Sequence, residues 1–143
     1  MSQVADILRH KGTAVHAIEP SASVHDAVVR MVEENVGALG VLEGDRVAGI
    51  LTQRDYLRQV AASERAARTL EVREIMSAPV VSVTSEAPID ECMTIMTEER
   101  IRHLPVIDDG ALAGIVSIGD LVKAKSAEQS TQIQVLHEYI TAR

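Results

Sequence analysis

Two stretches of the chain are nearly identical: AGILTQRDYL at residues 48–57 and AGIVSIGDLV at residues 113–122, which lie 65 positions apart. With this offset, residues 23–57 align with residues 88–122 without a gap, so that Met31 falls on Met96 and Asp55 on Asp120. The approaches are also alike, with VADIL before the first copy and VREIM before the second. A repeat of this length predicts two copies of one supersecondary unit, because one copy alone buries too little surface to be stable.

Each copy contains the same series of expected elements. Apolar residues at helical spacing predict an amphipathic helix in each copy, carried by Val24, Ala27, Val28, Met31 and Val32 in the first and by Ile89, Cys92, Met93 and Met96 in the second. Two apolar runs joined by a turn follow as a hairpin, with Gly44-Asp45 and Asp109-Gly110 as the turn residues. A second helix is expected from Arg54 and from Gly119, and a short strand at residues 14–18 and 80–83 opens each copy.

The sequence therefore predicts an α/β (α+β) fold of two β-α-β-β-α repeats packed with pseudo-twofold symmetry. We expect the first repeat at residues 4–62, a charged linker at 63–71, the second repeat at 72–125 and a C-terminal helix at 126–143. In that last helix Ile133, Leu136 and Ile140 form an apolar stripe with Tyr139 beside it. The stripe needs a partner, which is either the body of the same chain or a second copy.

Composition excludes several classes of function. The net charge of −7 and the absence of Phe and Trp argue against a nucleic-acid binder, which needs clustered positive charge and stacking platforms. No apolar run approaches 18 residues and the start of the chain lacks the apolar stretch of a signal peptide, so no membrane span is expected. Cys92 is the single cysteine, which fits the reducing cytoplasm.

The patterns Thr52-x-x-Asp55 and Ser117-x-x-Asp120 occupy the two expected helix starts. One interpretation is local N-capping, in which each side chain binds the backbone of its own helix. The other is ligand binding: a carboxylate can accept hydrogen bonds from both hydroxyls of a ribose, and a helix start favours an anion. The two roles can coexist.

The ordered set GILTQRD and GIVSIGD, RHLPVID at residues 102–108, and EIMSAPVVSV before the second copy resembles the tandem CBS-domain (Bateman) module over about residues 4–125. The chain is similar to the stand-alone bacterial type, with no attached enzyme or transporter. The resemblance implies a non-catalytic module that binds an adenine nucleotide, AMP, ADP, ATP or NAD, in clefts between the repeats. It also implies a homodimer and an unidentified regulated protein.

The resemblance further implies two clefts, each built from both repeats. One would combine Thr52, Arg54, Asp55, Pro79, Val80, Val81, Ile101, Arg102 and His103. The other would combine Thr13, Ala14, Val15, Val36, Gly37, Ala38, Ser117, Ile118 and Asp120. Because arginine binds phosphate bidentately, we expect the Asp55 cleft to prefer the more phosphorylated ligand. The Asp120 cleft would take a less charged ligand, a dinucleotide or nothing.

Other features favour plain structural roles. Cys92 aligns with Ala27 on the core face of its helix, which indicates a buried residue and no nucleophile. The histidines lack the spacing of a zinc site. These features give no support to an enzyme. The competing functional hypothesis is a constitutive interaction or dimerisation module without a physiological nucleotide.

Overall fold

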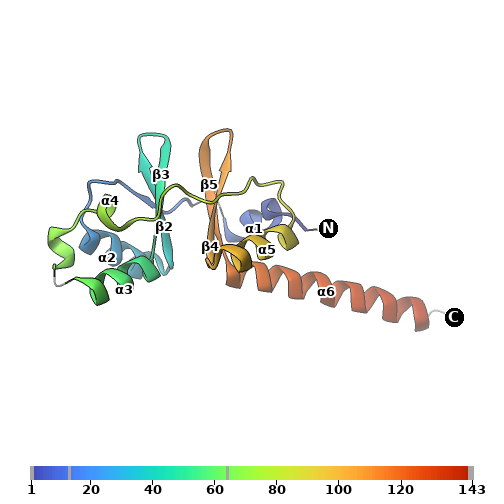
Figure 1. The fold of residues 1–143 in the computed structure, drawn as a ribbon. Helices are drawn as coiled ribbons and strands as arrows, with labels where there is room; N and C mark the ends of the chain where they lie inside the picture. Colours follow the sequence, from blue (N-terminus) through green and yellow to red (C-terminus); the bar gives the residue numbers. More distant parts are fainter. Residues whose placement is uncertain (1, 13, 64, 142–143) are drawn as a thin grey trace.

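The computed structural model describes residues 2–12, 14–63 and 65–141, which form two lobes side by side (Figure 1). The first lobe contains β1 (Ala17–Ile18), α2 (Val24–Glu34), β2 (Ala38–Glu43), β3 (Arg46–Thr52), α3 (Gln53–Ala62) and α4 (Val72–Ile75). The second contains α1 (Val4–Lys11), α5 (Ile89–Glu99), β4 (His103–Asp108), β5 (Ala111–Ser117) and the start of α6 (Ile118–Thr141). A short 3₁₀ turn, η1 (Ala67–Thr69), lies before α4. The predicted mixed fold of two repeats with a C-terminal helix is confirmed.

The two hairpins are built alike, down to their irregularities. Strand β2 pairs antiparallel with β3, and β4 pairs antiparallel with β5. Each pairing shifts register at the equivalent point, between Val41 and Leu42 and between Val106 and Ile107. The predicted turns are present, with positive φ values of 64° at Gly44 and 81° at Gly110 that glycine adopts without strain. The hairpins therefore present equivalent strand ends to the helices α3 and α6.

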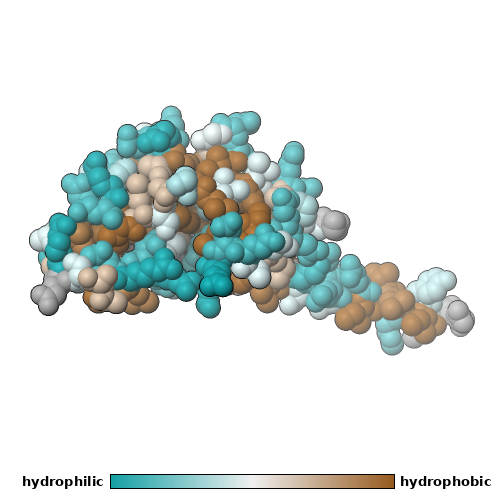
Figure 2. All heavy atoms as spheres, viewed as in Figure 1, coloured by the Kyte–Doolittle hydropathy of each residue, from teal (hydrophilic) through white to brown (hydrophobic). Residues whose placement is uncertain are grey.

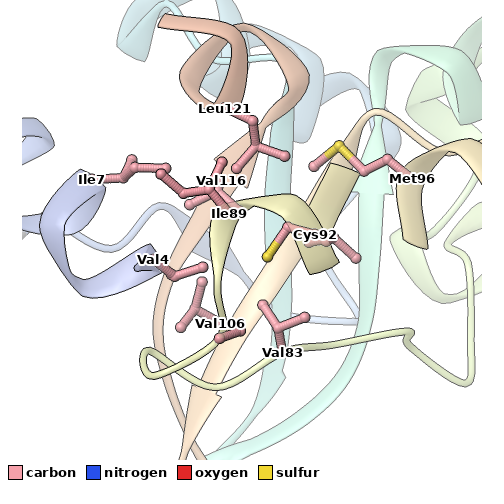
Figure 3. Packing of buried hydrophobic residues seen from close by; sticks show 11 residues of the cluster. Val4, Ile7, Val83, Ile89, Cys92, Met96, Val106, Val116 and Leu121 are labelled. Carbon is pink, nitrogen blue, oxygen red and sulfur yellow. The ribbon is translucent and has the colours of Figure 1, made fainter. Parts of the chain in front are cut away.

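Each lobe has its own aliphatic core, but the entry helices are exchanged between the repeats. Val4 and Ile7 of α1 pack into the core of the second lobe, against Ile89 and Cys92 of α5 (Figure 3). The backbone N–H of Val4 also donates to Ala87 O at 2.9 Å. Conversely, Val72 of α4 is buried in the core of the first lobe. The N-terminal helix, expected within the repeat at residues 4–62, thus completes the other lobe.

The short strands expected before the first helices are smaller than predicted. Residues 14–18 contribute only the two-residue strand β1, which runs parallel to β2. Of residues 80–83, only Val83 bridges the neighbouring hairpin, at Val106. The predicted core face of α2 is also narrower, because Val32 is 75% exposed. Val24, Ala27 and Met31 are the residues of this helix that fill the core.

Helix α6 runs without a break from Ile118 to Thr141, so the expected boundary between residues 125 and 126 lies inside one helix. Its sequence contains neither glycine nor proline after Gly119, and therefore nothing interrupts the helical hydrogen bonds. Leu121 is fully buried in the second core, whereas residues 129–140 are all exposed. The tail projects away from both lobes (Figure 1). The body of the chain is thus not the partner of the apolar stripe.

Candidate ligand-binding site

The two aspartates Asp55 and Asp120 close the same capping motif at the starts of α3 and α6. The Asp55 carboxylate accepts from the Thr52 N–H at 2.9 Å, and the Asp55 N–H donates to the Thr52 hydroxyl at 3.2 Å. Asp120 and Ser117 make the same two bonds, at 2.9 Å and 3.1 Å. The capping interpretation is therefore correct for both pairs. What each aspartate offers to a ligand depends on its remaining oxygen.

Asp55 has both carboxylate oxygens engaged and is only 7% exposed. Its Oδ2 accepts from Thr52, and its Oδ1 accepts from the hydroxyl of Ser77 at 3.0 Å. Ser77 is held there by two backbone hydrogen bonds with Ile50, at 2.9 and 3.1 Å. Both carboxylate oxygens of Asp55 are therefore already bonded within the chain.

Residues 76–77 can lie close to strand β3 because residue 49 is a glycine and has no side chain. A Cβ built on Gly49 would lie 2.8 Å from both Met76 Sδ and Ser77 O. Asp55 lines neither of the two cavities described below. Neither of these cavities gathers Asp55 with Pro79, Val80 and Val81.

This close approach predicts a matched pair of substitutions. We expect Gly49→Ala to destabilise the fold by about 1–3 kcal/mol, because its methyl group meets the fixed carbonyl of Ser77. Gly114→Ala at the equivalent position meets only the end of the Leu8 side chain, which can rotate, and so should cost clearly less. Urea unfolding of both variants measures the difference, and equal losses would contradict the fixed, close approach of residues 76–77 to Gly49.

Asp120 borders an open cavity of about 320 Å³ between the two lobes. Both of its hydrogen bonds from described residues, from Ser117 N–H and from Lys11 Nζ at 2.8 Å, are accepted by Oδ2. Its side chain is 22% exposed. Oδ1 therefore remains as an acceptor for a ligand.

The cavity draws its walls from both repeats and from α1. Of the residues expected around Asp120, the structure places Ala14, Val36, Gly37, Ala38 and Ser117 here. Val15 does not line it, and Thr13 lies outside the described residues. The remaining lining residues were not predicted for this cleft: Leu8, Lys11, Gly12, His16, Asn35, His103, Ala113, Gly114 and Ile115.

Lys11 is the most consequential of the unpredicted residues. Its ammonium group bridges Ile115 O and Asp120 Oδ2, each at 2.8 Å. Burial would raise the pKa of Asp120, but the Lys11 ammonium and the Ser117 N–H hold that pKa below its usual value. Asp120 is thus ionised at neutral pH. No motif marks Lys11 in the sequence, although it stands in the entry segment of the first repeat.

His103 was expected beside Asp55, but the structure places it in the Asp120 cavity. A Cβ at Gly37 would lie 3.0 Å from His103 Nε2, so the imidazole occupies the space that Gly37 leaves. Burial lowers the pKa of His103 below 6.5. The positive charge of Lys11 lowers this pKa further and that of Arg102 lowers it slightly, while the negative charge of Asp120 partly opposes them. A neutral imidazole therefore faces the cavity.

The predicted basic residues gather in a second, separate hollow. Arg54, Ile101 and Arg102 line a space of about 320 Å³ together with Met96, Thr97, Arg100 and Ile118. The Arg54 guanidinium donates to Arg100 O at 3.3 Å. Ile118, expected in the Asp120 cleft, lies here. The positive charge that the resemblance assigned to the Asp55 cleft thus lies in a hollow whose described lining contains neither Asp55 nor Asp120.

Residues 2–12, 14–63 and 65–141 contain no group of three or more histidine, cysteine or acidic side chains placed to hold a metal ion. Among the helices of these same residues, none combines the length and apolar character needed to cross a bilayer.

Two α+β lobes with exchanged entry helices and a cavity between them define a two-repeat module. The family model of the CBS domain matches residues 3–62 and 72–127. The chain therefore belongs to the CBS-domain family, as a pair of CBS repeats.

The chain is similar to the CBS domain-containing protein CBSX3, mitochondrial, of Arabidopsis thaliana, with 38% identity over 96% of this chain and 71% of the relative. The solved CBS-domain containing protein ATU1752 of Agrobacterium tumefaciens is 38% identical, with a TM-score of 0.82 over 87% of this chain and 99% of that one. The CBS domain pair of protein MJ0100, solved in complex with 5′-methylthioadenosine and S-adenosyl-L-methionine, has a TM-score of 0.79 over 90% of this chain and 98% of that one. At 22% identity it supports the fold alone.

Proposed function

We propose that this CBS pair is a non-catalytic sensor that binds an adenine nucleotide, AMP, ADP, ATP or NAD, in the Asp120 cavity. The single observation that carries the proposal is the ionised Asp120, with Oδ1 open toward a cavity that both lobes line. One carboxylate oxygen can accept from the two neighbouring hydroxyls of a ribose. The adenosyl ligands of the MJ0100 pair, which has the same fold, are in keeping with this chemistry.

The remaining walls suit the other parts of a nucleotide. Val36, Ala14 and Ala38 offer an apolar surface for a flat base. Lys11, His16 and His103 place nitrogen donors at the same cavity, where phosphate oxygens need them. The volume lies at the lower end of the range for small-molecule sites, which favours a mononucleotide over a dinucleotide.

The proposed consequence of binding is a change in how firmly the lobes are joined. The ligand would touch residues 36–38 of the first lobe and Asp120 of the second together, and so favour one relative arrangement. It can bias that arrangement only as far as it binds the two states differently. The proposal includes a homodimer, a cytoplasmic location and a regulated protein of unknown identity.

Isothermal calorimetry with AMP, ADP, ATP and NAD tests this proposal against the alternative of a constitutive interaction module. We expect saturable binding of at least one nucleotide with one site per chain. Adenosine should retain part of the affinity, and guanosine monophosphate should bind more weakly. Flat titrations with all four nucleotides would favour the interaction module instead.

The buried imidazole predicts a dependence on pH. In the free protein the pKa of His103 is lowered, so the ring is neutral at pH 7. A phosphate beside it would favour the imidazolium and raise that pKa, so AMP binding should take up a proton. Affinity for AMP is then expected to increase as the pH falls from about 7.5 toward 6, while affinity for adenosine does not.

The His103→Gln variant serves as the control for this pH dependence. It keeps a polar group in the cavity but cannot titrate, so any remaining dependence belongs to other groups at the cavity, which are the phosphate and His16. Calorimetry in buffers of different ionisation enthalpy measures the proton uptake directly. The same uptake in wild type and variant would contradict the role of His103.

A further inference from the structure

Strand β2 turns its two smallest residues toward the second lobe. The two hairpins stand side by side at the centre of the molecule (Figure 1). Leu39 and Val41 of β2 are fully buried in the core of the first lobe. Because successive side chains of a strand point to opposite faces, Ala38 and Gly40 lie on the face away from that core. The first lobe therefore leaves space at two neighbouring positions of its boundary with the second lobe.

Leu112 of β5 fills the space that Gly40 leaves. A Cβ built on Gly40 would overlap Cδ2 of Leu112, so the leucine side chain rests directly on the glycine backbone. Strands β2 and β5 are in contact across the boundary between the lobes. Figure 2 shows apolar surface gathered over the two hairpins, where the lobes meet. The leucine of one lobe thus fits into a gap in the other.

The internal repeat does not make this contact a second time. At the offset of 65 residues, Leu112 is equivalent to Val47, and Gly40 is equivalent to Pro105. Valine is shorter than leucine, and the ring of Pro105 occupies the place that a glycine leaves open. The contact between Leu112 and Gly40 is therefore a property of one side of the lobe boundary and not of the repeated fold.

This contact lies beside the Asp120 cavity on both strands. On the first-lobe side, the N–H of Gly40 donates to the carbonyl oxygen of His16 at 3.0 Å, and both His16 and Ala38 line the cavity. On the second-lobe side, the neighbour of Leu112 in the chain is Ala113, which also lines it. Neither Gly40 nor Leu112 lines the cavity itself. The pair can therefore act on a ligand only through the spacing of the cavity walls.

We propose that Leu112 and Gly40 are positioning residues, whose contact sets the separation of the two lobes and thereby the width of the Asp120 cavity. The effect on affinity rests on the proposed function, whereas the effect on lobe separation does not. A flat base between the walls is held by dispersion, and a gap of about 0.5–1 Å forfeits roughly a quarter to a half of that attraction. A separation that is fixed in advance also spares the ligand the cost of ordering the lobes.

Substitutions of matched size test this contact. Gly40→Ala adds one carbon where Leu112 lies, so that either the leucine turns aside or the lobes move apart, and Leu112→Ala empties the gap. The double variant Gly40→Ala with Leu112→Val moves one carbon across the contact and nearly conserves the filled volume, which is the kind of exchange that packed sites tolerate best. Val47→Ala, at the equivalent position of the other hairpin, lines neither cavity and is the matched control.

Distances between spin labels report the lobe separation without any ligand. Glu33→Cys on α2 and Glu98→Cys on α5 place labels at exposed, repeat-equivalent positions, and native Cys92 is fully buried and stays unlabelled. Dilution with unlabelled full-length chain restricts the signal to distances within one molecule. We expect one narrow distribution in wild type and Val47→Ala, a shifted or broadened one in Gly40→Ala and Leu112→Ala, and a restored one in the double variant. Unchanged distributions in both single variants would overturn the proposal.

Calorimetry with AMP then connects the spacing to the ligand. We expect Gly40→Ala and Leu112→Ala each to weaken AMP binding by about tenfold, the double variant to recover most of the loss and Val47→Ala to bind as wild type does. Cooperative thermal unfolding of every variant shows that they remain folded. Altered distances with unaltered affinity would refute the role in the cavity. A wild type that binds no AMP would refute the proposed function and with it the effect on affinity, while the label distances still decide the effect on lobe separation.

Discussion

Replacing Asp120 by alanine is expected to weaken binding of AMP by about tenfold to a few hundredfold, whereas Asp55→Ala should leave the affinity nearly unchanged. The reason is the state of each carboxylate in the folded chain. Asp120 keeps Oδ1 open beside the cavity, while both oxygens of Asp55 are already bonded to Thr52 and Ser77. Charge-assisted hydrogen bonds to ribose hydroxyls contribute roughly 1.5–3 kcal/mol each, and only Asp120 is free to form them.

Two controls separate the sugar contact from the loss of a charge. Asp120→Ala leaves the Lys11 ammonium without its carboxylate, which could strengthen phosphate binding and hide part of the loss. The double variant Lys11→Met with Asp120→Ala removes both charges, and binding of adenosine should remain weak. Comparing AMP with 2′-deoxy-AMP isolates the hydroxyl contact, because the variant should no longer distinguish them. Calorimetry measures all of these affinities, and an Asp55→Ala variant that loses affinity as strongly as Asp120→Ala would contradict the assignment.

The internal repeat was sufficient to predict the architecture, because the same local signals for helices and turns occur in both copies. Helical spacing, the turn at Gly44 and the turn at Asp109-Gly110 each specify a short segment, and the structure places them as expected. The exchange of entry helices was not predictable in this way. VADIL and VREIM read alike, and no local pattern says that Val4 completes the second core while Val72 completes the first.

The candidate site was predicted only in part, because both aspartates carry the same motif. What distinguishes them is the length of the entry segments: residues 4–18 lead into the first repeat, but only residues 72–83 into the second. With three more residues, α1 extends to Lys11, which reaches Asp120. In the shorter segment α4 ends at Ile75 and Ser77 pairs with Ile50 beside Asp55. The difference thus arises from segments far from either motif.

Pro79 is the signal that could have indicated where residues 76–77 lie. A residue before proline avoids helical backbone geometry, so α4 cannot continue toward Pro79 as α1 continues toward Lys11. The chain leaves the helix after Ile75 with Met76 in an extended conformation, and Ser77 pairs with the end of β3 at Ile50. Such pairing requires a small neighbour, which Gly49 supplies. The sequence contains each of these residues, but only the packed structure reveals that they act together.

Asp55→Ala is expected to lower the free energy of unfolding by about 2–4 kcal/mol, more than Asp120→Ala. The substitution removes the acceptor for the Thr52 N–H at the start of α3, and it also removes the acceptor for the Ser77 hydroxyl, at a carboxylate that is only 7% exposed. Asp120 closes the same kind of cap, but its surroundings are more open, so water can replace part of what is lost. Urea unfolding of both variants gives the comparison.

A double-mutant cycle then tests whether Asp55 holds the segment at residues 76–77 in place. Ser77→Ala removes the hydroxyl that Asp55 binds, so in that background Asp55→Ala should cost less than in wild type, by about 1 kcal/mol. Full additivity of the two substitutions would mean that Asp55 acts only as a helix cap. A positive coupling energy, together with unchanged AMP affinity in Asp55→Ala, would assign the two aspartates different tasks. Asp55 would then join the second entry segment to the first lobe, while Asp120 serves the ligand.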